Sequence, residues 1–458
     1  MYGSYAHIGT LDYHILSYGY FMKRKRTNSF HLLAKPTGAA CNLDCGYCFF
    51  LSKEMLYPGS RFRMADELLE EYIRQLLEAH NVSVVTIAWQ GGEPMLMGLP
   101  FFQRSIEYVE KHRKRRVSIE YTIQTNATLI DDEWAAFFEK HDFLVGVSVD
   151  GPRPIHDKFR VDKGGQPTFD KVMQGIQILQ RHGVAFNTLT TLHSANATQP
   201  LEIYRFLRDE CQSGFLQFIP IIERVNDPVP INPNPTPGGV RPESLRVFSP
   251  WSSWRDRPLY TQQGQSVTDR SVTPEQYGEF LIGIFEEWVR HDVGSVYVQM
   301  FDVSLASWVG ESTGLCVHSK TCGEALALEH NGDLYSCDHF VEPAYKLGNI
   351  LEQRMSDLVA LPQQRKFGLD KFDTLPHQCR ACDVRFVCHG GCPKDRFTTT
   401  ASGEPGLNYL CAGYKRFFTH IREPMKIMAE LIRHHRSPSE IMRWYAQKDA
   451  SATRGTPV

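Results

Sequence analysis

The chain has 458 residues, of which 42% are hydrophobic and 22% are charged, and its formal net charge is −2. This length allows two or three domains with sizeable cores, and the near-neutral charge excludes a general attraction to nucleic acid or an anionic membrane. No run of about 18 apolar residues is present, and the first residues lack a signal-peptide pattern, so we expect a cytoplasmic protein without a membrane span.

Strand-like and helix-like segments alternate from about residue 29 to 222, and this alternation predicts parallel strands joined by crossover helices. The expected strands cover 31–36, 82–89, 117–124, 143–150, 184–192 and 215–222. The expected helices cover 65–80, about 100–115, 131–141, 168–182 and 202–211. Six strands are too few for the usual closed eight-stranded barrel, so the sheet is expected to be open.

Polar or glycine-rich segments follow the first four expected strands. They are CNLDCGYC (41–48), QGGEP (90–94), QTNAT (124–128) and SVDG (148–151). Parallel strands bring their carboxyl ends to one edge of a sheet, where α/β proteins place their sites. We therefore expect these four segments to share one mouth.

The pattern changes after residue 225. The proline and glycine density of residues 226–273 excludes a long helix or central strand, and predicts a long loop between domains. A helix is expected over 273–292, with Thr273 as N-cap and Pro274 at the first helical position. The tail beyond about 447 is expected to be disordered. Residues 1–28 fit no element, and Met22 is an alternative start of translation.

Twelve cysteines are distributed unevenly along the chain. Cys41, Cys45 and Cys48 are spaced C-x₃-C-x₂-C, whereas Cys211 is isolated and is interpreted as a buried hydrophobic residue at a helix end. Three thiolates hold three corners of a [4Fe–4S] cube and leave one iron without a protein ligand. The alternatives are a zinc knuckle that lacks its fourth ligand, or loop thiols that have no partner.

The other eight cysteines lie in the last third of the chain and suit two sets of four ligands. They are Cys316, Cys322, Cys337, Cys379, Cys382, Cys388, Cys392 and Cys411. Cytosolic thiols stay reduced, which favours metal binding over a disulfide framework. Two zinc ribbons are the chemically allowed alternative to two clusters. The segment ALALEHNGDLYSC (325–337), which follows Cys322 and ends at Cys337, predicts a hairpin with Asn331–Gly332 at its turn.

The motif CNLDCGYC resembles that of the radical S-adenosylmethionine (SAM) enzymes, and the later cysteines resemble the SPASM extension. The resemblance implies an α/β fold, with a partial (β/α)₆ radical SAM barrel followed by a cysteine-rich SPASM domain. The implied division is 1–28 N-terminal extension, 29–225 barrel, 226–310 linker and helix, 311–415 SPASM domain and 416–458 C-terminal helix with a disordered tail. Three [4Fe–4S] clusters and SAM are the implied cofactors.

The same resemblance assigns ligands. The first auxiliary cluster takes Cys316, Cys322, Cys337 and Cys392, and the second takes Cys379, Cys382, Cys388 and Cys411. Gly91, Gly92 and Glu93 look like the GGE motif that receives the methionyl part of SAM, where glycine permits close approach. The other implied SAM contacts are Tyr47 near the adenine, Ser148 and Arg160 at the ribose and carboxylate, and Ile221 at the adenosyl group. Asp150 and Asn126 suit structural caps as well as ligands.

Four longer segments resemble the anaerobic sulfatase-maturating enzymes over about residues 29–430. They are QGGEPMLMGLPFF, VSVDGPRPIHDKFR, NGDLYSCDHF and GLNYLCAGYKRFF. The resemblance implies oxygen-independent oxidation of a cysteine or serine, in a sulfatase C/S-x-P/A-x-R motif, to Cα-formylglycine by a SAM-derived 5′-deoxyadenosyl radical. It also implies an unfolded or nascent sulfatase and a low-potential electron donor, such as flavodoxin or ferredoxin, as partners.

Asp338 falls on the position of the family's proposed general base. We expect burial to raise the pKa of Asp338 and so narrow its gap to the pKa of a thiol substrate. The runner-up function is another radical SAM/SPASM enzyme that makes thioether or carbon–carbon crosslinks in a peptide. Many of those enzymes carry a recognition domain before the barrel, where this chain has only about 28 residues. A non-enzymatic iron–sulfur or zinc scaffold would not need a three-cysteine site beside GGE.

Overall fold

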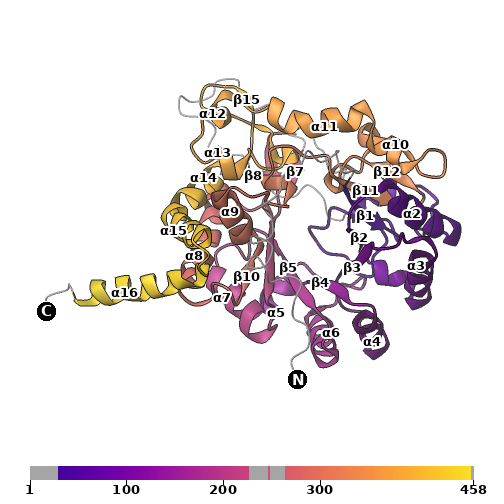
Figure 1. The fold of residues 1–458 in the computed structure, drawn as a ribbon, viewed down its shortest axis with the longest axis horizontal. Coiled ribbons are helices and arrows are strands. Elements are labelled where there is room, and N and C mark those ends of the chain that lie inside the picture. Colours follow the sequence, from indigo (N-terminus) through magenta and orange to yellow (C-terminus); the bar gives the residue numbers. More distant parts are fainter. Residues whose placement is uncertain (1–28, 226–245, 248–263, 455–458) are drawn as a thin grey trace.

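A computed structural model describes residues 29–225, 246–247 and 264–454 of the protein. The expectations for residues 1–28 and for most of the loop at 226–273 lie outside the described residues. Figure 1 shows strands curved around an open centre, with helices along the outside of the curve. No described helix is both long enough and apolar enough to cross a membrane.

The first half of the chain forms the six expected strands. They are β1 (His31–Lys35), β2 (Val84–Trp89), β3 (Ser118–Thr125), β4 (Phe143–Ser148), β5 (Phe186–Leu192) and β6 (Phe215–Pro220). Each strand pairs in parallel with the next, which confirms the prediction from the alternating pattern. Because both faces of such strands are covered, their central residues are apolar, as at Ile87, Val145 and Leu216, all fully buried.

Five helices of six or more residues connect these strands, and the short helix α5 (Arg153–His156) also lies between β4 and β5. The five longer helices are α2 (Asp66–Ala79), α3 (Leu99–His112), α4 (Asp132–Lys140), α6 (Phe169–His182) and α7 (Pro200–Arg205), which continues as a π-helical turn over Phe206–Glu210. Each presents an apolar stripe to the sheet, as Leu69, Ile73 and Leu76 do on α2. Cys211 ends the π-helical turn and is fully buried, as the sequence predicts.

The sheet does not stop at the barrel strands. On one side, β1 pairs in parallel with β11 (Ala325–Glu329), which continues into β12 (Asp333–Tyr335) and β13 (Lys346–Asn349). On the other side, β6 pairs with β10 (Tyr297–Val298), giving one ten-stranded sheet. The hairpin predicted at Asn331–Gly332 is present, and Gly332 has the φ of +91° that favours glycine at the turn. The barrel and the cysteine-rich region therefore share one sheet.

Helices dominate the rest of the chain. They are α8 (Pro274–His291), α9 (Gln299–Val309), α10 (Met355–Val359), α11 (Pro362–Asp373), α12 (His377–Arg380), α13 (Arg385–Cys388), α14 (Cys411–His420), α15 (Arg422–Arg433) and α16 (Ile441–Arg454). Thr273 caps α8 in a capping box with Gln276, and Pro274 is the first helical residue, which confirms the expected helix start. The expected disorder beyond residue 447 is wrong as far as Arg454, where α16 ends, and the remainder of that prediction lies outside the described residues.

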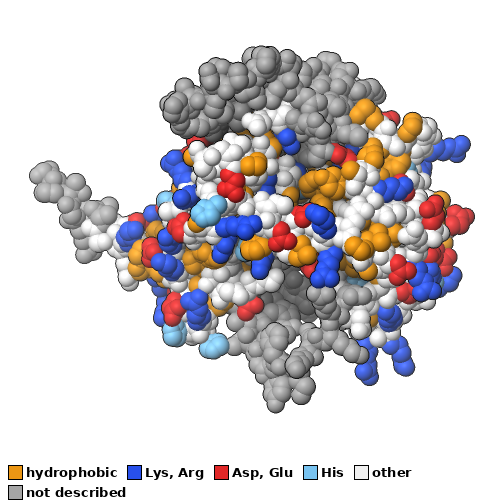
Figure 2. Space-filling view, turned by 90° about the horizontal axis from the view of Figure 1, so that it is seen from above, with side chains coloured by type: hydrophobic (Ala, Val, Ile, Leu, Met, Phe, Trp, Pro, Cys, Tyr) orange, Lys and Arg blue, Asp and Glu red, His pale blue; other side chains and the backbone are white. Residues whose placement is uncertain are grey.

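Helices α8 and α14 approach closely because both carry glycine at the contact. A Cβ atom on Gly413 would lie 2.0 Å from the carbonyl oxygen of Pro274, and one on Gly278 would lie 3.0 Å from Gly413. This contact attaches the helix that begins at Cys411 to the helix that follows the loop region. Figure 2 shows basic and acidic side chains intermixed on the visible face, in agreement with the near-zero net charge.

Candidate active site

A partly open cavity of about 390 Å³ lies at the carboxyl ends of the barrel strands. Residues of all four predicted strand-end segments line it, including Cys41, Gly91, Asn126 and Ser148, which confirms that these segments share one mouth. The far side of the same cavity is lined from the cysteine-rich region, by Cys316 and Cys392 among others. Two cysteine motifs that are distant in the sequence therefore face one space.

The loop with the first three cysteines is fixed by backbone hydrogen bonds to residues 159–161. Asp44 N–H donates to the Val161 carbonyl at 2.8 Å, and Gly46 N–H donates to the Phe159 carbonyl at 2.9 Å. All three thiols line the cavity. Burial raises the pKa of Cys45 to about 12, with Arg160 opposing the rise and Cys48 adding to it.

These thiols suit an iron–sulfur cluster. Burial also raises the pKa of Cys41, and the neighbouring Glu93, Cys48 and Cys45 add to the rise. Metal ligands must lose their protons, and bound iron would relieve the repulsion between three crowded thiolates. In the described part of the chain, no three His, Cys, Asp or Glu side chains converge on a single ion position. The ligands of a cubane bind different irons, so cluster binding does not require that convergence.

In the GGE segment (91–93), the structure gives a different reason for the glycine at position 92 than the one expected from the sequence. Gly91 and Gly92 line the cavity, yet a Cβ atom on Gly92 would lie 2.0 Å from the carbonyl oxygen of Ala40. The glycine is therefore required by the cysteine loop that packs behind it, whereas the expected reason was close approach to a ligand. Glu93 N–H donates to the same carbonyl at 2.9 Å.

Glu93 is buried behind the glycines and does not line the cavity. Its carboxylate accepts hydrogen bonds from the backbone N–H of Asn126 at 2.8 Å and of Met95 at 3.0 Å, and from the Thr125 hydroxyl at 2.9 Å. Burial raises the pKa of Glu93 to about 7, although these hydrogen bonds oppose the rise. Glu93 thus ties the end of β2 to the end of β3.

Tyr47 and Arg160 both line the cavity and share one buried partner, Asp150. The Tyr47 hydroxyl donates to Asp150 Oδ2, and Arg160 Nε lies 3.1 Å from the same oxygen. Asp150 also accepts the backbone N–H of Thr191 at 3.0 Å. Burial disfavours its charge, but Arg160 and His193 hold the pKa of Asp150 below its ordinary value. Asp150 therefore acts as a structural support for two cavity residues.

The remaining expected SAM contacts also reach the cavity. Ser148 accepts a hydrogen bond from Gln124 Nε2 at 3.0 Å, and Ile221 directly follows β6. Asn126 donates to Asn42 Oδ1 at 2.8 Å, inside the cysteine loop, so this residue both lines the cavity and braces the loop.

All twelve cysteines are free thiols, so the disulfide alternative is not formed. Cys316, Cys322, Cys337 and Cys392 lie close enough to affect one another's titration. Burial raises the pKa of Cys337, and the thiols of Cys392 and Cys316 raise it further. Burial raises the pKa of Cys322 to about 11, with Lys371 opposing the rise and Cys316 adding to it.

Cys379, Cys382, Cys388 and Cys411 form a second neighbourhood. Burial raises the pKa of Cys388 to about 12, and the other three thiols add to the rise. Burial raises the pKa of Cys411 to about 11, and Cys379 and Cys382 raise it further. Within each expected set of four late cysteines, neighbouring thiols therefore raise one another's pKa. Each group has the donor set of a fully ligated cluster.

The surroundings and the pKa of Asp338 both differ from those expected of the general base. Its carboxylate does not line the cavity but faces Lys35, whose Nζ lies 2.5 Å from Oδ1. Burial favours the neutral acid, as expected, but Lys35, His339 and Lys53 outweigh it and hold the pKa of Asp338 below its ordinary value. The expected rise in the pKa of Asp338 is therefore wrong. The Lys35 ammonium favours the ionised carboxylate, and the sequence alone does not indicate that these two residues meet.

The neighbouring His339 lines the cavity and was not predicted as a site residue. Its Nδ1 lies 3.9 Å from Cys392 Sγ, and burial lowers its pKa to about 3. The other cavity residues that sequence analysis missed include Gln124, Thr191, Lys394 and Asp395. Gln124 alone had a signal, since it begins the predicted segment QTNAT; the others lie outside the recognised motifs.

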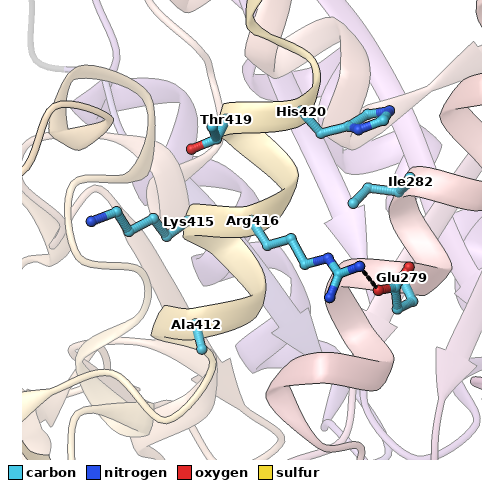
Figure 3. Close-up of a pocket in the computed structure, with 7 residues that line it drawn as sticks. All are labelled: Glu279, Ile282, Ala412, Lys415, Arg416, Thr419 and His420. Atoms are coloured by element: carbon cyan, nitrogen blue, oxygen red, sulfur yellow. Dashed lines mark ion pairs between the residues drawn. The ribbon is translucent and has the colours of Figure 1, made fainter.

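A second hollow of about 630 Å³ lies between α8 and α14 and is open to solvent. Figure 3 shows Arg416 of α14 reaching Glu279 of α8, with Ile282 and His420 nearby. None of its lining residues is a cysteine, and its charged groups include this surface ion pair. The cavity at the carboxyl ends of the barrel strands is therefore the candidate active site.

Two family models match the chain. The radical SAM superfamily model matches residues 36–207, and an iron–sulfur cluster-binding domain, SPASM, matches residues 316–383. These matches confirm the expected fold class of a radical SAM barrel followed by a SPASM domain.

Curated relatives match almost the whole chain. A serine-type anaerobic sulfatase-maturating enzyme of Bacteroides thetaiotaomicron is 42% identical over 422 residues, covering 92% of this chain and 96% of the relative. A cysteine-type enzyme of Clostridium perfringens strain 13 is 32% identical, covering 85% of this chain and 95% of the relative. Both substrate types are thus represented among the relatives.

Solved structures agree with these matches. The native anSMEcpe with bound AdoMet and Cp18Cys peptide has a TM-score of 0.71 and 30% identity, covering 88% of this chain and 99% of that chain. SuiB from Streptococcus suis has a TM-score of 0.53 at 13% identity, covering 84% of this chain and 77% of that chain, which shows a shared fold alone.

Proposed function

This chain belongs to the anaerobic sulfatase-maturating enzymes, which are radical SAM oxidoreductases, and we propose that it oxidises a cysteine or serine of a sulfatase to Cα-formylglycine. The observation that carries the proposal is the shared cavity. The three cysteines of the first motif and two cysteines of the later group line the same cavity. A substrate side chain in that space would lie between a radical source and an electron acceptor.

We assign three [4Fe–4S] clusters to the three cysteine groups, with SAM at the open iron of the first. Gly91, Gly92, Tyr47, Ser148, Arg160 and Ile221 are the proposed SAM contacts, and all line the cavity. Bound there, SAM supplies a 5′-deoxyadenosyl radical that removes one hydrogen atom from the substrate Cβ. The fixed charge of Arg160, held by Asp150, suits the SAM carboxylate.

The protein's own groups then complete a two-electron oxidation. After loss of a hydrogen atom, the substrate must still lose one proton and one electron to become an aldehyde or thioaldehyde. We assign Asp338 as the base that accepts this proton. Its lowered pKa keeps the carboxylate ionised at neutral pH. An ordinary thiol and an ordinary aspartate differ by about 4.6 pKa units, or about 6 kcal/mol, and the lowered pKa widens this gap. Proton loss is therefore coupled to removal of the electron.

A base must come within hydrogen-bond reach of the proton that it accepts. Asp338 contacts Lys35, whereas His339 lines the cavity. The assigned role therefore requires either that Asp338 exchange Lys35 for the substrate or that His339 relay the proton. Burial keeps the His339 ring neutral, so one ring nitrogen can accept a proton while the other donates one, without the ring holding a positive charge.

The partners follow from the same proposal. The substrate is an unfolded or nascent sulfatase segment in the cytoplasm, because an extended segment can enter a cavity of about 390 Å³ whereas a folded active site cannot. The electron that starts SAM cleavage comes from a low-potential donor such as flavodoxin or ferredoxin.

The test is a pair of synthetic peptides that carry the C-x-P-x-R and S-x-P-x-R motifs. With SAM, a low-potential reductant and no oxygen, the serine peptide should lose two hydrogen atoms in mass. The cysteine peptide should give the same aldehyde. Peptides with alanine at the target position are the control. If SAM is cleaved and neither peptide becomes an aldehyde, or if a crosslinked product forms instead, the proposal is wrong.

A further inference from the structure

A buried lysine lies among the first group of late cysteines. Lys371 of α11 is 1% exposed, and its ammonium donates to the carbonyl oxygens of Cys316, Val317 and Ser319, at 2.9 Å for Val317 and 2.5 Å for Ser319. These three bonds satisfy all three ammonium donors. Carbonyl oxygens carry no net charge, however, so the hydrogen bonds leave the positive charge of Lys371 uncompensated.

Arg396 extends this arrangement toward the second group. Its guanidinium donates to the Lys371 carbonyl at 2.5 Å and to the carbonyls of His389, Gly390 and Gly391 at 2.8–3.1 Å. Those three residues lie between Cys388 of one group and Cys392 of the other, and all three have positive φ, which turns their carbonyls toward Arg396. The two cations therefore connect the two cysteine groups.

No carboxylate forms an ion pair with Lys371 or Arg396 among the residues that the structure describes. The nearest groups that can become anionic are thiols: Lys371 contacts the carbonyl of Cys316, and Cys322 Sγ lies 3.8 Å from the carbonyl of Phe367 on the same helix as Lys371. Burying a cation without an anionic partner is costly, so these positions require negative charge from the thiolates.

We propose that Lys371, supported by Arg396, is the fixed counter-charge of the auxiliary clusters and raises the reduction potential of the cluster held by Cys316, Cys322, Cys337 and Cys392. A four-thiolate cluster is anionic, and one-electron reduction makes it more negative by one unit. A nearby cation stabilises the reduced form more than the oxidised form, which raises the potential. In the reaction proposed above, this cluster takes the electron that the substrate loses.

The inference rests on the proposed cluster ligands, but not on the identity of the substrate. It is tested on full-length protein with reconstituted clusters, by redox titration with titanium(III) citrate followed by electron paramagnetic resonance. Lys371→Gln removes the charge and keeps an N–H donor, whereas Lys371→Arg keeps the charge. Lys366→Gln is the matched control, because Lys366 lies on the same helix but is exposed and paired with Asp370 at 2.6 Å.

At a fixed applied potential, Lys371→Gln should lower the ratio of reduced to oxidised auxiliary cluster by about tenfold or more, which is a shift of about 59 mV for one electron. Lys371→Arg and Lys366→Gln should leave the ratio near that of the unchanged protein, as should the first-motif cluster in every variant. An unchanged ratio in Lys371→Gln would overturn the inference.

Loss of the cluster itself is also informative. If Lys371→Gln loses about four iron atoms and Lys371→Arg retains them, the positive charge is required for cluster assembly and the counter-charge role is supported. If both variants lose the iron equally, Lys371 has a packing role and the inference is wrong. Absence of iron from these cysteines in the unchanged protein would instead contradict the proposed cofactors.

Discussion

Lys35 and Asp338 form a buried ion pair between the first barrel strand and the auxiliary-cluster region, with Nζ 2.5 Å from Oδ1. Lys35 ends β1 and is fully buried, and Asp338 directly follows Cys337. The Lys35 ammonium also lies 4.5 Å from the centroid of the Phe50 ring, just after the first cysteine motif. One lysine thus contacts a residue beside each of two cysteine groups, and fixes the proposed base relative to the barrel.

Asp338→Asn should nearly abolish formylglycine production while leaving SAM cleavage intact. The amide is nearly isosteric but cannot take a proton, and loss of a general base typically costs about 10²–10⁴-fold. Hydrogen abstraction precedes proton loss, so deuterium from a Cβ-labelled peptide should still appear in 5′-deoxyadenosine. Product and deoxyadenosine are measured together by mass spectrometry.

Asp333→Asn is the matched control for that substitution. Asp333 lies in the strand just before Asp338 but contacts Lys346 at 2.7 Å rather than Lys35, so its loss should not uncouple SAM cleavage from product. A near-normal aldehyde yield from Asp338→Asn would move the base elsewhere. His339→Gln and Asp150→Asn would then be measured in the same assay.

The iron content should separate the three cysteine groups. Reconstituted protein should hold about twelve iron atoms, as three cubes of four. Joint replacement of Cys41, Cys45 and Cys48 by alanine should remove about four of them and abolish SAM cleavage. Metal analysis after anaerobic purification measures this directly. Stoichiometric zinc with little iron would contradict the cluster assignment.

Gly92→Ala should weaken SAM binding through the cysteine loop. The added Cβ would lie 2.0 Å from the Ala40 carbonyl oxygen, so the loop that carries Cys41 must shift. Overpacking of this kind costs about 1–3 kcal/mol, and we expect SAM affinity to fall by about tenfold or more. Equilibrium binding measures the effect. Gly214→Ala has no atom within 4 Å of the added Cβ and should bind normally; equal losses in both variants would refute this explanation.

Glu93 should make the folded protein less stable as pH rises. Burial raises its pKa from an ordinary 4.5 to about 7, so the folded state holds this proton more tightly than the unfolded state. Its contribution to stability is therefore full below about pH 4.5 and is lost as pH rises through about 7, a change of about 3 kcal/mol. Glu93→Gln, which cannot ionise, should lack this loss. Denaturation curves of both proteins across this pH range test it, and parallel pH profiles would exclude the effect.

Local sequence patterns were sufficient to predict the barrel elements and their shared mouth. Strands such as 82–89 and 143–150 alternate with amphipathic helices, and periodicity is a local property that a single sequence displays. Thr273 and Pro274 likewise mark a helix start through their own chemistry. The cysteine spacing predicts cluster ligands because metal coordination needs particular residue types at short intervals.

Non-local contacts were not predictable in the same way. Nothing near Lys35 in the sequence indicates that its ammonium meets Asp338, and this contact reverses the expected direction of the Asp338 pKa. Glycine at Gly92 is explained by the Ala40 carbonyl, which belongs to a different segment. Lys371 and Arg396 also read as ordinary surface cations until the fold places them among cysteines. Each case depends on which strands and helices become neighbours.

The pairing of β1 with β11 also affects how the chain folds during synthesis. His31 pairs with Ala325, 294 residues later in the sequence. At about 5–20 residues per second, the ribosome needs roughly 15–60 s to produce that partner. Until then one edge of β1 has unpaired backbone N–H and carbonyl groups, which can pair with strands of other chains. The nascent barrel is therefore open to aggregation for most of its translation, and its first strand acquires its final neighbour only when the auxiliary region emerges.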